Sequence, residues 1–396
     1  MGDQLVALGG AFLAAGVLAR LGRRIGLPTI PFFMLAGVIF GPHTPGIALV
    51  DDPHSLELLA AIGLVMLLFH LGLEFSLRDL VDGGASLLTI GAIYLALNIG
   101  GGLAFGFALG WGSREALVIA GALGISSSAI VTKLLTELHR LANPESRLIL
   151  GIIVVEDVFL ALYLAILQPV LGKASGALDA LAQFATALGF LLAMFVIARF
   201  GARLVGRLIA TSDDELLTVC FVGLAVLSAG IAEELGVSDA IGAFMIGLVL
   251  AETSVAPRIE RLVLPLRDAF AAVFFFAFGL TVDPSDAGSV IVPVLLAVAL
   301  SLALNVAAGL IAARRQHFGR GTAANIGLTV LGRGEFSLIL ATLALEAGLD
   351  ERIGPFVGFY VLILALVAPV LASRAPQLAR LIPASLFPAR GASETG

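Results

Sequence analysis

The sequence predicts an all-α polytopic membrane protein with about 13 transmembrane helices. Of its 396 residues, 59% are hydrophobic and only 13% are charged, a composition typical of a chain that lies mostly within a bilayer. Apolar stretches of ~20 residues, long enough for a helix to cross the hydrocarbon core, recur along the whole chain. This composition excludes a soluble enzyme, and no basic patch predicts binding to nucleic acid.

The apolar stretches predict a single transmembrane domain over residues 1–373. The tail at 374–396 is rich in Pro, Ala and Arg and is too short for a soluble regulatory domain. The expected spans lie near residues 4–21, 28–42, 55–75, 84–108, 114–136, 147–170, 178–203, 214–232, 237–253, 263–282, 288–312, 321–347 and 355–373.

The basic residues predict the orientation of these spans. Of the 23 Lys and Arg residues, 19 fall in the odd-numbered loops or after the last span, and only three fall on the opposite side. The remaining one, Arg333, lies inside a span. Because cytoplasmic loops carry the excess of Lys and Arg, we expect a cytoplasmic C-terminus and an N-terminus outside, in the cell membrane.

A weak internal repeat relates the two halves of the chain at a shift of about 207 residues. The motif LALN at 95–98 recurs at 302–305, and Gly72 and Gly37 match Gly279 and Gly247 at similar shifts. Repeat one covers about 4–170, a linker span covers about 178–203 and repeat two covers about 214–373. Six spans, one linker and six more spans would invert the second half, which is typical of secondary transporters with a substrate site near the midplane.

The repeat also predicts two discontinuous helices. Residues 124–128 (GISSS) interrupt the fifth span, and residues 332–335 (GRGE) interrupt the twelfth at the corresponding place. Glycine weakens a helix, while Ser126, Ser127 and Ser128 could satisfy the backbone groups that unwinding leaves open, or contact a dehydrated cation. Arg333 and Glu335 could serve the second interruption, and we expect the two interruptions to cross at mid-membrane.

The adjacent acids Glu156 and Asp157 lie in the middle of the apolar run 148–167. Each ionisable group at the bilayer centre costs about 3 kcal/mol, so two in succession predict a site for an ion or a proton. Neighbouring residues are rotated by ~100° on a helix, so we expect Glu156 to face a partner and Asp157 to face the cavity. The alternative is a structural salt bridge between helices.

Five segments together resemble the monovalent cation:proton antiporter-2 family, over about residues 12–368. Within the family, the chain looks most like the membrane subunit of bacterial potassium/proton antiporters whose gating domain is a separate protein. The segments are 121–131 (GALGISSSAIV), 156–157 (ED), 68–75 (LFHLGLEF), 239–248 (DAIGAFMIGL) and 332–337 (GRGEFS).

The resemblance implies a core domain that carries the crossed helices and a second domain that forms a homodimer. It also implies that Asp157 is the carboxylate that binds the ion and the proton. A partly dehydrated cavity favours the neutral form of a carboxylate, so Asp157 could exchange a proton for a cation near neutral pH. The short tail suggests a separate, soluble cytoplasmic regulatory subunit as a partner, besides the lipid bilayer.

The sequence departs from the family pattern at one position. Some sodium-transporting relatives carry a lysine in the eleventh span that pairs with the first acid, whereas the matching residue here is Asn305. A neutral amide cannot neutralise Glu156, so Arg333 is the natural counter-charge at depth. Its partner could be Glu156, Glu74 or Glu335, and the sequence does not choose between them.

The sequence therefore predicts a secondary antiporter that exchanges K⁺ for H⁺ and needs no cofactor. Potassium rests on the resemblance, and Na⁺/H⁺ exchange is the alternative. A gated potassium channel fits less well because the chain lacks a filter like TVGYG and contains buried acids. An intramembrane enzyme would need a nucleophile with a base or a set of metal ligands, and neither HExxH nor GxSxG is present.

Overall fold

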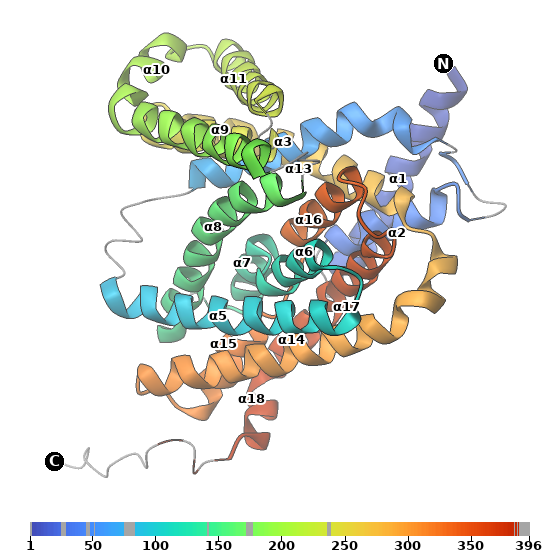
Figure 1. Cartoon of the computed structure of the whole chain (residues 1–396), viewed down its shortest axis with the longest axis vertical. Helices are drawn as coiled ribbons and strands as arrows, with labels where there is room; N and C mark the ends of the chain where they lie inside the picture. Colours follow the sequence, from blue (N-terminus) through green and yellow to red (C-terminus); the bar gives the residue numbers. More distant parts are fainter. Residues whose placement is uncertain are drawn as a thin grey trace.

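The computed structural model describes residues 2–24, 29–44, 48–50, 52–74, 84–140, 142–171, 177–235, 239–383, 385 and 387. The regular elements in these ranges are all helices, which confirms the prediction of an all-α protein (Figure 1). Phe75, the last residue of the LFHLGLEF motif, and most of the tail after 383 lie outside the described residues.

The described residues of the first half form seven α-helices. A 3₁₀ turn at Pro53–Leu56 leads into the third, and Pro144 at the first position of the last has the fixed φ that suits a helix start. They are α1 (Gly2–Arg24), α2 (Ile30–Phe40), α3 (Glu57–Glu74), α5 (Gly84–Leu109), α6 (Ser113–Gly124), α7 (Ser128–Glu137) and α8 (Pro144–Leu171).

The second half follows a long linking helix. This linking helix consists of α9 (Ala177–Val196), a π-helical turn at Ile197–Gly201 and α10 (Ala202–Ile209). The side chain of Asp213 then caps α11 by accepting hydrogen bonds from the backbone N–H groups of Glu215 and Leu216. The remaining helices are α11 (Asp214–Glu234), α12 (Asp239–Ala251), α13 (Ala256–Thr281), α14 (Ala287–Arg315), α15 (Arg320–Thr329), α16 (Glu335–Glu346), α17 (Ile353–Ser373) and the short α18 (Ala375–Leu378).

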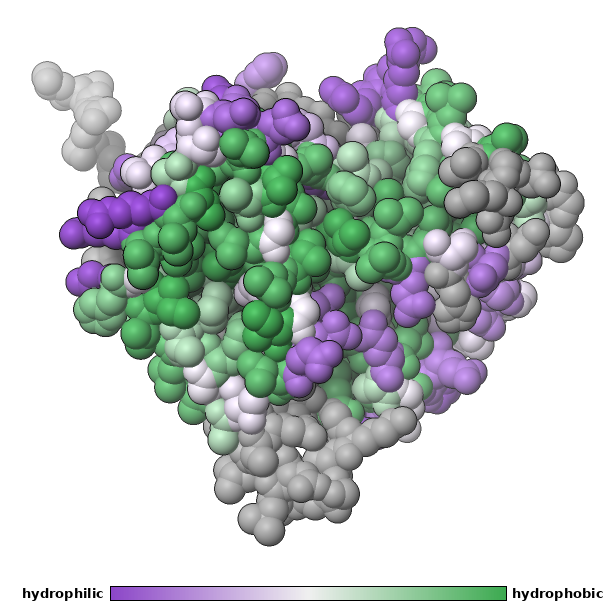
Figure 2. Space-filling view, turned by 90° about the horizontal axis from the view of Figure 1, so that it is seen from above, coloured by the Kyte–Doolittle hydropathy of each residue, from purple (hydrophilic) through white to green (hydrophobic). Residues whose placement is uncertain are grey.

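Within the described residues, seven helical stretches are long and apolar enough to cross a bilayer. The other expected spans coincide with α1, α2, α8 and α12 and with the two interrupted helices. Large apolar side chains such as Leu192, Phe200 and Leu296 are exposed, which suits contact with lipid. Figure 2 shows a broad apolar area on one face, bordered by hydrophilic residues.

The helices pack most extensively within two groups. One group contains α1, α2, α3, α11, α12 and α13, and the other contains α5 to α8 and α14 to α17. Helix α9 contacts both α8 and α12 and so connects the groups. The acids of α8 therefore belong to the second group, and part of α8 faces α12 of the first group.

Close contacts at glycines occur at two equivalent places in the first group. Gly72 of α3 packs on Gly247 of α12, and Gly37 of α2 packs on Gly279 of α13. A Cβ atom on Gly72 would lie 2.1 Å from the carbonyl oxygen of Phe244, so a larger residue would force the two helices apart. The four glycines are the ones matched by the internal repeat, and each contact joins one repeat to the other.

A hydrogen-bonded polar cluster joins the repeats in the second group. The Asn305 Nδ2 atom of α14 donates to Oδ1 of Asn98 on α5 at 3.1 Å, and the Tyr94 hydroxyl donates to Oδ1 of Asn305 at 2.7 Å. All three side chains are at most 1% exposed. The matched residues of the two LALN motifs are thus in direct contact.

We expect Gly72→Ala to lower the free energy of unfolding by about 1–3 kcal/mol, because its methyl group would collide with the backbone of α12. Gly223→Ala on α11 is the control, since a Cβ atom there meets no atom within 4 Å. Thermal unfolding of the two purified variants measures the difference. Equal melting temperatures for both variants would contradict the close packing of α3 on α12.

Candidate functional site

The two acids of α8 point to different surroundings. Glu156 and Asp157 lie in the middle of this unbroken helix and are 1% and 7% exposed. Glu156 faces the interruption between α6 and α7, whereas Asp157 faces a cavity that α3 and α12 also line. Neither acid forms an ion pair in the described part of the chain, so the structure gives no support to the alternative of a structural salt bridge.

The first interruption occupies residues 125–127, between α6 and α7, at the predicted place. Its backbone is held by Glu156. The Ser126 N–H donates to Oε1 of Glu156 at 3.0 Å, and the Ser126 hydroxyl donates to Oε2. One buried carboxylate therefore satisfies both the unwound backbone N–H and the hydroxyl of Ser126. Ser126 is the partner that Glu156 faces.

The second interruption occupies residues 330–334, between α15 and α16, and it crosses the first. The Ser127 N–H donates to the carbonyl oxygen of Gly332 at 2.9 Å, and the Ser337 hydroxyl donates to the carbonyl oxygen of Ala122 at 2.7 Å. A Cβ atom on Gly334 would lie 2.8 Å from the Ser127 hydroxyl. The glycine therefore allows the two unwound segments to touch.

Arg333 binds the carboxyl ends of both interrupted helices. This fully buried side chain donates from Nε and Nη2 to the carbonyl oxygen of Leu123 at 3.0 and 2.8 Å. Its Nη1 atom donates to the carbonyl oxygens of Val330 and Leu331 at 2.9 and 3.1 Å. The last carbonyls of a helix lack partners and carry partial negative charge, so one guanidinium neutralises the ends of α6 and α15.

The acceptors of Arg333 differ from those considered from the sequence. None of the hydrogen bonds described above ends on Glu74, Glu156 or Glu335. Arg333 thus binds two helix ends directly, and its role as a counter-charge to an acid at depth stays a prediction.

Glu335 occupies the complementary position at the amino ends of α7 and α16. It is the first residue of α16, is 3% exposed, and accepts hydrogen bonds from the hydroxyls of Ser127 at 2.6 Å and Ser128 at 3.4 Å. Helix amino ends carry partial positive charge, which a carboxylate stabilises. The crossing thus places carboxylates at the amino ends and a guanidinium at the carboxyl ends.

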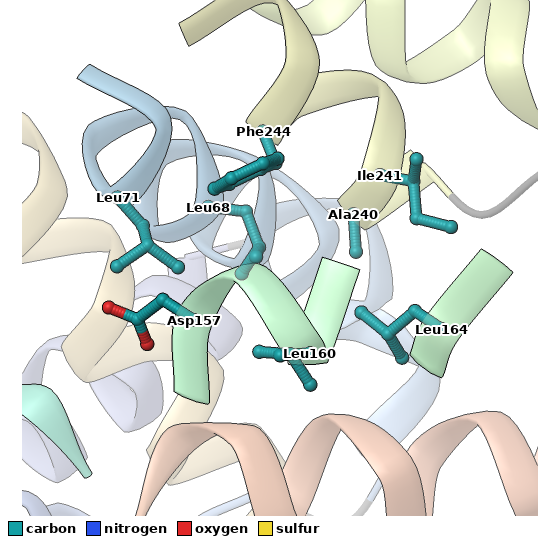
Figure 3. A pocket seen from close by; sticks show the side chains of 8 residues that line it. All are labelled: Leu68, Leu71, Asp157, Leu160, Leu164, Ala240, Ile241 and Phe244. Atoms are coloured by element: carbon teal, nitrogen blue, oxygen red, sulfur yellow. The ribbon is translucent and has the colours of Figure 1, made fainter. Parts of the chain in front are cut away.

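Asp157, unlike Glu156 and Glu335, binds no helix end among the described residues of the crossing. Its Oδ1 atom is the one buried side-chain nitrogen or oxygen without a hydrogen-bond partner in the described part of the chain. The carboxylate faces an apolar cavity between the two groups of helices (Figure 3). The other lining residues are Leu68, Leu71, Leu160, Leu164, Ala240, Ile241 and Phe244. A buried carboxylate in apolar surroundings is stable only when a proton or a cation neutralises it.

The remaining predicted residues lie further from the two crossing segments. Asn305 reaches the crossing through Tyr94, whose hydroxyl lies 3.3 Å from the carbonyl oxygen of Val330. The side chain of Glu74 is 53% exposed at the end of α3, where one of its oxygens lies 3.5 Å from Nδ1 of His70. The structure thus brings together the three serines, Arg333 and Glu335, with Asn305 behind them and Glu74 at a helix end.

Sequence reasoning missed several residues of the site. Tyr94 lies one helical turn before Asn98, on the same face of the helix, so the LALN repeat could have drawn attention to it. The apolar side chains around Asp157, such as Leu68 and Phe244, give no comparable signal, because they do not differ from the many residues that face lipid or fill the interior.

An unpartnered carboxylate beside a crossing of two interrupted helices is characteristic of secondary ion transporters. The family model described as sodium/hydrogen exchanger, transmembrane, matches residues 10–374, and the chain belongs to this family. It is therefore a multi-pass protein of the cell membrane and a cation/proton antiporter, which confirms the resemblance found in the sequence.

Two curated relatives match almost the whole chain. The K⁺/H⁺ antiporter subunit KhtU of Bacillus subtilis is 39% identical over 387 residues, which cover 96% of each chain. The ammonium/H⁺ antiporter subunit AmhT of Alkalihalophilus pseudofirmus is 29% identical over 385 residues, which cover 95% of this chain and 94% of that protein.

A solved structure has the same fold. The sodium proton antiporter MjNhaP1 from Methanocaldococcus jannaschii at pH 8 superimposes with a TM-score of 0.72 over 96% of this chain and 99% of that chain. The two sequences are 17% identical, so this likeness concerns the fold alone.

We expect Arg333→Met to lower the free energy of unfolding by about 3 kcal/mol or more, because it leaves several buried carbonyls without donors, each at about 1–3 kcal/mol. Arg352→Met is the control, since the Arg352 side chain is 47% exposed and pairs with Asp350 at the surface. Chemical unfolding of both variants measures the difference. An Arg333→Met protein as stable as the control would contradict the role given to Arg333.

Proposed function

We propose that this protein exchanges K⁺ for H⁺ across the cell membrane by competition of the two ions for Asp157. One observation carries the proposal: Asp157 is buried beside the helix crossing, and its Oδ1 atom has no hydrogen-bond partner among the described residues. The other charged groups of the crossing have helix ends or hydroxyls to bind, so Asp157 is the carboxylate that remains for a transported ion.

Competition at one carboxylate explains the coupling. A proton neutralises Asp157 by a covalent bond, and a cation neutralises it by direct contact with its oxygens. Either ion removes the cost of a bare charge in an apolar cavity, but both together would leave a net positive charge there. Asp157 neutralised by a proton becomes accessible from one side and Asp157 neutralised by a cation from the other. The two ions therefore cross the membrane in opposite directions, which is antiport.

The choice of cation rests on the relatives. KhtU, at 39% identity, is described as a K⁺/H⁺ antiporter subunit, which supports potassium. The alternative is Na⁺, in agreement with the description of the matched family. A gated potassium channel is a weaker third candidate, because a carboxylate that must be neutralised favours coupled exchange over free conduction.

We further propose the arrangement in the membrane that the sequence predicts. It has thirteen crossings in one domain over 1–373, an outside N-terminus and a cytoplasmic C-terminus. The repeats cover about 4–170 and 214–373, with the linker span near 178–203 and the tail at 374–396. Two observations support the inverted repeats: the matched residues Asn98 and Asn305 are in contact, and the contact of Gly72 with Gly247 has its equivalent in that of Gly279 with Gly37. Reporter fusions to the two termini test the orientation.

Two partners belong to the proposal. A homodimer follows from the family resemblance, and a soluble cytoplasmic regulatory subunit is supported by the description of KhtU as a subunit. The mass of the purified protein in detergent tests the dimer. Co-purification with the products of neighbouring genes tests the regulatory subunit.

We expect Asp157→Asn to abolish cation-dependent proton efflux from acid-loaded inverted membrane vesicles, because an amide can neither release a proton nor neutralise a cation. Addition of KCl should raise the internal pH in the wild type, and the comparison of KCl with NaCl ranks the two cations. Asp286→Asn, at an exposed position before α14, is the control and should transport as the wild type does.

Two results would contradict this proposal. Cation-dependent proton efflux that persists in Asp157→Asn would place the exchange site elsewhere. Cation flux without any change in internal pH, in the wild type, would favour a channel.

A further inference from the structure

Arginine side chains form a regular stripe where the linking helix ends. Arg199, Arg203 and Arg207 follow each other at intervals of four residues, through the π-helical turn and α10. Four residues of α-helix rise about 6 Å, so the three side chains leave the helix on one side, about one turn apart. All three residues are exposed.

A second stripe, which is apolar, runs directly beside the arginines. Phe200, Leu204 and Leu208 each follow one of the arginines in the chain and are 76%, 63% and 76% exposed. The opposite side of α10 packs inward, where a Cβ atom on Gly206 would lie 3.1 Å from the side chain of Thr253 at the end of α12. The two stripes therefore lie on the outward surface of the molecule, at the margin formed by α9, α10 and α11 (Figure 1).

The arginines of this stripe lack acidic partners. In the described part of the chain, none of the three forms an ion pair, and Arg199 lies over the ring of Phe200 at 5.5 Å. The two acids at the start of the next helix have other partners. Asp214 binds Arg258 at 2.5 Å and Arg261 at 3.5 Å, and Asp213 caps α11. The stripe thus presents three guanidinium groups that are available to an external anion.

The position along the helix identifies the kind of anion. Exposed apolar residues such as Leu188, Leu192 and Phe195 cover α9, so this part of the linking helix lies within the hydrocarbon region of the bilayer. The arginines lie in the second half of the apolar stretch Leu188–Ile209, near its end, where their long side chains can reach the level of the headgroups. Guanidinium groups beside an apolar stripe match the phosphate and the acyl chains of one lipid molecule.

We propose that Arg199, Arg203 and Arg207 form a binding site for the headgroup of an anionic phospholipid, with Phe200, Leu204 and Leu208 against its acyl chains. This site is separate from Asp157 and does not depend on which cation is exchanged. In the orientation proposed above, it lies in the cytoplasmic leaflet. The linking helix contacts α12 at its end, so the bound lipid would also hold α12, whose residues line the Asp157 cavity.

Thermal unfolding of the purified full-length protein with added lipid tests this site. Phosphatidylglycerol should raise the melting temperature of the wild type by about 3–5 °C, whereas phosphatidylcholine should not. The triple variant R199Q/R203Q/R207Q should fold normally, because these residues are exposed, and should lose the shift. The control R20Q/R23Q/R24Q removes the same charge from the exposed end of α1 and should keep the shift.

Four results would overturn the proposal. The wild type could show no shift with phosphatidylglycerol, or the stripe variant could keep it. Equal loss in both triple variants would indicate a general effect of positive charge. A similar shift with inorganic phosphate or glycerol phosphate would indicate a site for a free anion and not for a lipid. The melting temperature of the stripe variant without lipid separates loss of binding from loss of folding.

Discussion

The structure depends on the neutralisation of four helix ends where two interrupted helices cross. Unwound backbone inside a bilayer is costly unless protein groups satisfy it. Arg333 binds the carboxyl ends of α6 and α15, and Glu335 lies at the amino ends of α7 and α16. Glu156 binds the remaining donors at Ser126. With these groups in place, each of the four helix ends has a side chain of opposite charge beside it.

The crossing leaves Asp157 as the carboxylate for the proposed exchange. Glu156 and Asp157 are adjacent in the chain, yet the rotation between them places one on the crossing and the other on the cavity. Glu156 accepts hydrogen bonds from the backbone and the hydroxyl of Ser126. Asp157 lies in a cavity whose walls come from both groups of helices, so a movement of one group against the other would change its access to solvent. Close glycine contacts hold the first group together, and the polar cluster of Tyr94, Asn98 and Asn305 joins helices of the second, which favours movement of the groups as units.

Much of the fold could be predicted from the sequence, because long apolar stretches and their polar borders determine where membrane helices begin and end. The stretch expected at 84–108 is α5 (Gly84–Leu109), and the one expected at 355–373 is α17 (Ile353–Ser373). Glycine also marked both interruptions, together with serines at the first and with Arg333 and Glu335 at the second. The pairing of Arg333 could not be predicted, because backbone carbonyls leave no mark in a sequence, whereas Glu74, Glu156 and Glu335 all look like partners. The residues that line the Asp157 cavity could not be predicted either, because its leucines do not differ in sequence from leucines that face lipid.

The most direct test of the account is a measurement of proton release when K⁺ binds to the purified protein in a weakly buffered solution. Competition for Asp157 predicts about one proton released for each K⁺ bound, at a pH where Asp157 is protonated before K⁺ is added, and no release from Asp157→Asn. Binding of K⁺ without proton release by the wild type would show that the two ions occupy different sites, and it would contradict the mechanism.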